Sequence, residues 1–134
     1  MNNFKIIFLS ILILLTTGVC FAEIDKKKAD QVAGKTLEIF TNINMILNRV
    51  TKPEHITKDV KSSLKKHIHE LKKLKAEINK IRNESPKNVK VLNEQFKKGS
   101  FSEALQKTVK IFFQNVKRIK KLNGGDELVK IIVV

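Results

Sequence analysis

The sequence contains neither tryptophan nor tyrosine, and among its 134 residues there are only one cysteine, two prolines and five glycines. Nucleic-acid bases stack on aromatic side chains, so the absence of two of the three aromatic residue types disfavours nucleic acid as a partner. A glycine-rich phosphate loop is also absent, because Gly124 and Gly125 are not followed by the lysine and helix that such a loop needs.

The single cysteine, Cys20, lies in an N-terminal segment with the layout of a secretory signal peptide. Lys5 gives this segment a basic start, residues 6–15 form a largely apolar run, and small residues follow up to Ala22. The run is shorter than the about 20 apolar residues that span a bilayer. We therefore predict that residues 1–22 are cleaved off and that the protein is exported to the periplasm or secreted. No transmembrane span is expected in the mature chain.

Two other fates are compatible with this segment. Cys20 could be acylated as the N-terminus of a lipoprotein, although Val19 stands where that processing generally requires Gly, Ala or Ser, or the segment could stay as an uncleaved anchor. After cleavage behind Ala22 the mature chain has no cysteine. This excludes disulfides, thiolate metal sites, a cysteine nucleophile and a c-type haem.

Arginine is scarce as well, since only Arg49, Arg82 and Arg118 stand among the 27 basic residues. The formal net charge is +14, and removal of Lys5 with the signal peptide leaves +13. Such a charge attracts anionic surfaces, such as phosphorylated glycolipid, acidic phospholipid or acidic polysaccharide. Lysine attracts them diffusely, without the bidentate phosphate binding of arginine. A lysine-rich composition that serves only solubility, as AT-rich coding favours, is the alternative.

Apolar residues recur every three or four positions in four segments, which predicts amphipathic helices over about 25–50, 53 or 58–83, 86–98 and 101–122. Pro53, Pro86 and Gly99 mark the breaks between them. No segment alternates as a strand does. We predict an all-α, up-down-up-down four-helix bundle over residues 23–125. The apolar tail 126–134 either packs as a last helical turn over the end of the bundle or stays loose.

The second predicted helix carries a row of apolar side chains that includes Leu64, Leu71 and Ile78, with His67 as its one polar member. Its basic residues fall on outward positions, and the fourth helix ends in a second basic run. A solvated helix face shows the same pattern. The candidate anion-binding residues are Lys65, Lys66, Lys72, Lys73, Lys75, Lys117, Arg118, Lys120 and Lys121.

The sequence offers neither a metal site nor a catalytic site. His67 and His69 would point about 200° apart on a helix, and His55 is distant from both. Glu70 and Glu77 have the spacing of interhelical ion-pair partners rather than of paired catalytic carboxylates. We therefore expect no enzymatic activity, no metal and no cofactor.

A glycine turn followed by Glu103 and Ala104 opens the last predicted helix. In this feature, and in length, export signal and helix plan, the chain resembles the small soluble b-type cytochromes of the periplasm. The resemblance implies a four-helix bundle, and family members hold haem between a methionine near the start of the first helix and a histidine near the end of the last. Residues 25–35 contain no methionine and residues 101–122 no histidine, so no haem ligand is carried over.

The sequence thus favours an exported, non-enzymatic binding protein whose lysine-rich faces meet an anionic envelope component or an acidic protein. One alternative is a haem-binding electron-transfer protein with rewired ligands, such as His67 with Met45. The other is a chaperone-like or assembly module that docks through residues 128–134.

Overall fold

The computed structural model describes residues 24–133, which form five α-helices and one short 3₁₀-helix and contain no strand. The predicted all-α class is therefore confirmed for this part of the chain. The predicted signal peptide and Cys20 lie outside the described residues. The elements are α2 (Lys26–Arg49), η1 (Pro53–His55), α3 (Lys58–Glu84), α4 (Pro86–Phe96), α5 (Gly99–Lys120) and α6 (Gly125–Val133).

Helix α2 lies at the centre of the arrangement. The Asp25 carboxylate caps it by accepting a hydrogen bond from the backbone N–H of Lys28 at 2.8 Å. The buried face of α2 is wider than a single apolar stripe, because its members follow each other at steps of one and three. This width lets α2 pack against α3, α4 and α5 at once. The buried residues are Ala29, Val32, Ala33, Thr36, Ile39, Phe40, Ile43, Asn44 and Leu47.

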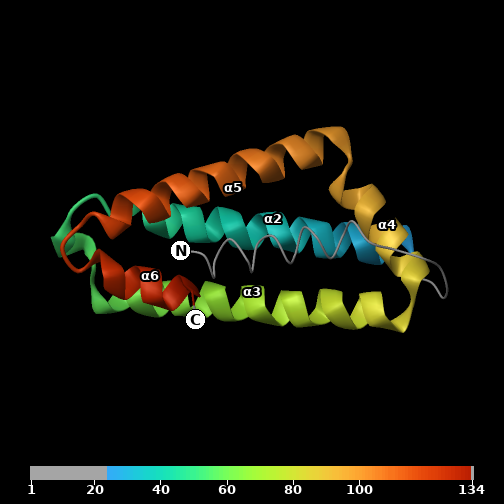
Figure 1. The fold of residues 1–134 in the computed structure, drawn as a ribbon, viewed down its shortest axis with the longest axis horizontal. Helices are drawn as coiled ribbons and strands as arrows, with labels where there is room; N and C mark the ends of the chain where they lie inside the picture. Colours follow the sequence, from blue (N-terminus) through green and yellow to red (C-terminus); the bar gives the residue numbers. More distant parts are fainter. Residues whose placement is uncertain (1–23, 134) are drawn as a thin grey trace.

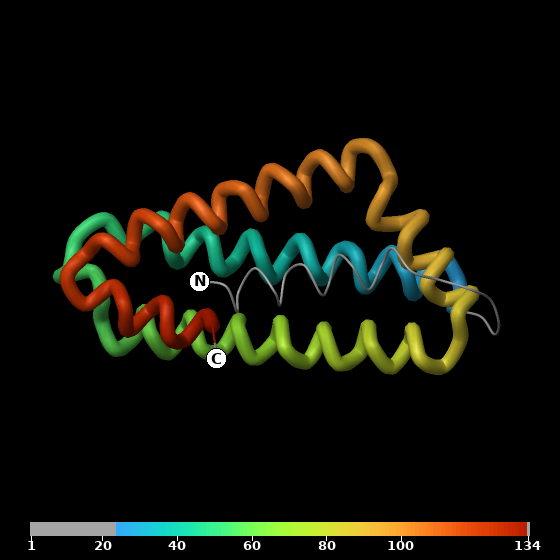
Figure 2. The backbone as a smooth tube through the Cα atoms, viewed as in Figure 1, coloured from blue at the N-terminus to red at the C-terminus, as the bar shows by residue number. Residues whose placement is uncertain are grey.

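The long helices do not pack in chain order. Helices α2 and α5 run in the same direction, while α3 and α6 run in the opposite one (Figures 1 and 2). Helix α2 packs against both α3 and α5, and α6 packs against the same two helices, whereas α3 and α5 are not close neighbours. Helix α4 crosses one end of the molecule to connect them and packs mainly on α2.

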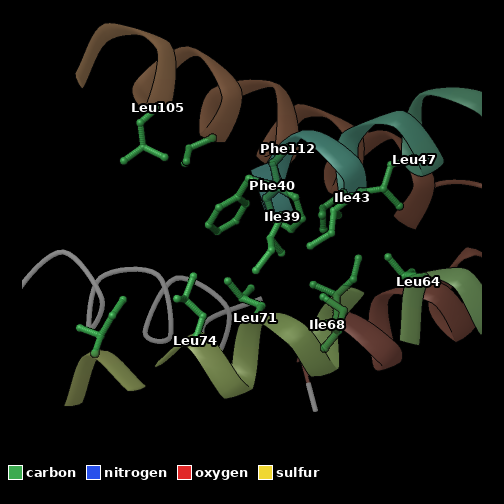
Figure 3. Close-up of a cluster of buried hydrophobic side chains, with 14 of the residues drawn as sticks. Ile39, Phe40, Ile43, Leu47, Leu64, Ile68, Leu71, Leu74, Leu105 and Phe112 are labelled. Carbon is green, nitrogen blue, oxygen red and sulfur yellow. The ribbon is translucent and has the colours of Figure 1, made fainter. Parts of the chain in front are cut away.

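The core lies between these helices (Figure 3). The rings of Phe40 on α2 and Phe112 on α5 meet edge to face, with centroids 5.7 Å apart, and both side chains are fully buried. Burying an aromatic or aliphatic side chain of this size stabilises the folded state by about 1.5–3 kcal/mol. Figure 3 shows that α3 contributes the facing side chains Leu64, Ile68, Leu71 and Leu74.

The C-terminal residues, for which the sequence left two alternatives, form α6. Leu128 and Ile132 are buried against the core, so residues 126–133 are packed over more than a single turn. The preceding turn is tight. Gly124 has a positive φ of 80°, and a Cβ added to Gly125 would lie 1.8 Å from the carbonyl oxygen of Ile119.

One local prediction differs from the structure. His67 was predicted in the apolar row of the second helix, but the buried side chain at this level is Ile68, and His67 is only half-buried. Of the two predicted starts of the second helix, Pro53 begins the short η1, and Lys58 is confirmed as the start of α3. The Thr57 hydroxyl caps this start by accepting a hydrogen bond from the N–H of Val60 at 3.2 Å.

Candidate anion-binding surface

Eight of the nine candidate anion-binding residues are lysines on α3 and at the end of α5. They are Lys65, Lys66, Lys72, Lys73, Lys75, Lys117, Lys120 and Lys121. All except the half-buried Lys75 are exposed. Within residues 24–133, none of these eight ammonium groups forms an ion pair or a hydrogen bond with another side chain or with the backbone. Their charges are therefore available to a ligand.

Arg118, the ninth candidate, has a structural role. Its guanidinium donates hydrogen bonds to the carbonyl oxygens of Val50 and Leu47, the latter at 2.9 Å, and to the side-chain oxygen of Asn115 at 3.2 Å. The last carbonyls of a helix lack their usual partners within it. Arg118 supplies a donor to the Val50 carbonyl and a second donor to the Leu47 carbonyl, which also accepts from the N–H of Val50. A sequence signal existed, because Arg118 is the only arginine in a run of lysines and its planar fork suits several acceptors.

Lys65 and Lys72 lie in a groove that neither helix forms alone. A cavity of about 370 Å³ between α3 and α6 is lined by Lys65, Ile68, His69, Lys72, Lys130 and Ile131. None of these six residues carries a carboxylate. Lys130 could not be identified from the sequence, because the pattern of residues 126–134 does not show which helix the tail meets.

Lys73 lies in a different groove, between α2 and α3. This cavity of about 260 Å³ is lined by Lys35, Glu38, Ile39, Glu70, Lys73, Leu74 and Glu77. Three carboxylates therefore face two ammonium groups. Glu77 also accepts a hydrogen bond from Lys28 at 2.6 Å, and this bond is the main reason why the pKa of Glu77 lies below its usual value. An anion is therefore attracted less strongly to this groove than to the groove between α3 and α6.

The remaining lysines are spread over the surface. Lys66 is exposed on α3, and Lys75 is half-buried instead of pointing outward as predicted. Lys117, Lys120 and Lys121 lie at the C-terminal end of α5, which is also where α6 begins. The structure thus gathers Lys65 and Lys72 with Lys130 around one groove and leaves the other candidates on separate parts of the surface.

The two residues named for the haem alternative, Met45 and His67, differ in their exposure to solvent and in their contacts. Met45 on α2 is 52% exposed, whereas the half-buried His67 on α3 places its Nδ1 3.3 Å from a carboxylate oxygen of Glu70. Within residues 24–133, no three His, Cys, Asp or Glu side chains come close enough to hold a metal ion. None of the helices from α2 to α6 is both long enough and apolar enough to cross a membrane.

No protein-family model matches the sequence, and no curated protein and no solved structure matches it significantly. The function has to be inferred from the charges and contacts of the chain itself.

Proposed function

We propose that the protein is an exported, non-enzymatic binding protein whose lysine-rich faces contact an anionic envelope component or an acidic partner. In this proposal the signal peptide is removed after Ala22, and the mature chain is a single helical bundle. One observation carries the proposal: eight exposed or half-exposed lysines of α3 and α5 have no partner within residues 24–133.

Folding leaves most of the lysine charge on α3 and at the end of α5 without a partner in the described residues. Ion pairs such as Lys28–Glu77 and Lys61–Glu127 join neighbouring helices and serve the fold. The unpaired lysines add to a formal net charge of +13 in the predicted mature chain and serve no such internal contact. Attraction of this kind acts within a Debye length, which is about 8 Å at physiological ionic strength. Binding should therefore be strong at low salt and weaken as salt is added.

A panel of polyanions tests the proposal. The mature domain is titrated with vesicles that contain phosphatidylglycerol, with an acidic polysaccharide and with polyglutamate, at low and at high salt. The test variant reverses four exposed lysines (K65E, K72E, K117E and K120E). A matched control reverses four exposed lysines outside the candidate set (K26E, K27E, K90E and K97E) and so changes the net charge by the same amount.

We expect the test variant to lose most of its affinity for at least one polyanion, while the control keeps most of it and both variants stay helical by circular dichroism. Equal losses in the two variants, or a wild-type protein that binds none of the three polyanions at low salt, would contradict the proposal.

A further inference from the structure

We propose that the groove between α3 and α6 binds the head group and the first methylenes of an anionic phospholipid. This inference rests on the proposed function and adds to it a site and a ligand class. Six side chains line the cavity: three lysines, one histidine and two isoleucines.

The basic side chains converge because of helix periodicity. Lys65, His69 and Lys72 follow each other at steps of four and three, so they share one face of α3. Lys130 approaches from α6 on the other side of the cavity. Three lysine side chains therefore border one space of about 370 Å³, a volume within the range of small-molecule sites.

The floor of the same cavity is apolar. Ile68 on α3 is buried, and Ile131 on α6 is half-buried. Helix α6 turns Leu128 and Ile132 into the core, and this orientation leaves Ile131 beside α3. A polysaccharide or an acidic peptide would use the lysines but has no need of an apolar floor. A lipid uses both, because its phosphate meets the ammonium groups and its methylenes cover the isoleucines.

No residue that lines the groove carries a carboxylate. Glu127, in the first turn of α6, is ion-paired with Lys61 of α3 and interacts only secondarily with Lys130. The cavity between α2 and α3 gives a contrast in the same molecule, because three glutamates line it. Charge complementarity to an anion is thus a property of the α3/α6 groove and not of every groove in the fold.

Two triple variants with equal charge change test the site. The groove variant carries K65Q, K72Q and K130Q, and the matched control carries K27Q, K90Q and K97Q, which lie outside the candidate set, all at exposed positions. Binding of the mature domain to phosphatidylcholine vesicles with and without phosphatidylglycerol is measured at low salt, with circular dichroism as the check on folding. Each lysine near an anionic membrane surface contributes about fivefold to affinity, so the groove variant should bind on the order of 100-fold more weakly. The control should keep most of the wild-type affinity.

A third variant tests the apolar floor separately from charge. I131Q should weaken binding to phosphatidylglycerol vesicles while leaving the affinity for soluble glycerol 3-phosphate unchanged, because only the lipid carries methylenes to this position. If I131Q lowers the affinity for vesicles and for glycerol 3-phosphate equally, the apolar floor does not contact lipid methylenes, and the lipid assignment is wrong.

The outcomes separate this inference from the proposed function. If wild type binds the vesicles and the groove triple loses no more affinity than the control triple, the groove is wrong, and the four-lysine reversal variants decide the proposed function separately. If wild type binds polyglutamate but not the vesicles, the lipid is wrong and an acidic partner takes its place. If wild type binds neither the vesicles nor polyglutamate nor the acidic polysaccharide, the inference and the proposed function are both overturned.

Discussion

Arg118 on α5 donates a hydrogen bond of 2.9 Å to the carbonyl oxygen of Leu47, 71 residues earlier in the chain. The same guanidinium also bonds the carbonyl oxygen of Val50, where α2 has ended. Because α2 and α5 run in the same direction, the carbonyl ends of both helix dipoles lie at this end of the molecule (Figure 1). One cation there is favourable for both dipoles.

Replacing Arg118 by alanine should therefore reduce the free energy of unfolding by about 1.5–3 kcal/mol, because half-buried carbonyl oxygens lose hydrogen bonds from a charged donor. Lys117→Ala is the control, since it removes the same charge from an exposed neighbour and should change stability by less than about 0.5 kcal/mol. Urea unfolding followed by circular dichroism measures both. Similar small losses would show that these hydrogen bonds do not hold α5 to α2.

Gly125→Ala should destabilise the fold, because the new Cβ would lie 1.8 Å from the carbonyl oxygen of Ile119 and 2.8 Å from its carbon. The clash is with backbone, so no side-chain rotation relieves it. We expect a loss of about 1–3 kcal/mol in urea unfolding, as for an overpacked site.

The matched substitution Gly34→Ala should have the opposite sign. Gly34 is exposed within α2, and a Cβ there would meet no atom within 4 Å. Alanine in a helix interior is more favourable than glycine by about 0.5–1 kcal/mol. If Gly34→Ala raises the free energy of unfolding and Gly125→Ala leaves it unchanged, the turn between α5 and α6 is not as tight as described.

Leu128→Ala tests whether α6 belongs to the core. Leu128 is fully buried, so truncation should cost about 2–5 kcal/mol of unfolding free energy. Lys130→Ala, on the exposed side of the same helix, should cost little. If the two variants unfold at the same urea concentration, residues 125–133 contribute no core packing.

Glu77→Gln should change how stability depends on pH. The hydrogen bond from Lys28 lowers the pKa of Glu77 below 4.5 in the folded state, so the unfolded state binds this proton more readily. The stabilisation is complete at neutral pH, begins to decline near pH 4.5, and is lost as the pH falls through the lowered pKa. Because the pair is partly exposed, we expect at most about 1 kcal/mol at pH 7.

The control for this prediction is Glu84→Gln, which removes the same charge from an exposed pair with Lys80 at 3.9 Å. Thermal unfolding of wild type and both variants is compared at pH 7 and at pH 3. A wild-type advantage over Glu77→Gln that persists undiminished at pH 3 would contradict the role assigned to the Glu77 carboxylate.

The helical elements could be predicted from the sequence because each depends on local periodicity. The predicted segments 25–50 and 86–98 lie within two residues of α2 and α4. Gly99 was predicted to mark the break between two helices, but it is the first residue of α5. Glycine fits an open helix start as well as a helix end, and periodicity alone does not separate the two.

Contacts between distant residues could not be predicted in the same way. Ile68 replaces His67 in the core because α6 covers that side of α3, and no pattern within α3 reveals a neighbour that starts at Gly125. The composition of the candidate site also depends on such a distant contact. Lys65 and Lys72 could be found from charge and spacing, whereas their association with Lys130 depends on how α6 packs.

The order in which the helices pack also bears on how fast the chain folds. Helix α5 packs on α2 and α6 packs on α3, so core contacts such as Phe40 with Phe112 join residues that are far apart in the sequence. The chain must close these long loops before the contacts repay the lost entropy. Folding rates fall as contacts become less local, so this chain should fold more slowly than a bundle of successive hairpins of equal length. The early folded species should be the α2–α3 hairpin, with α5 still undocked.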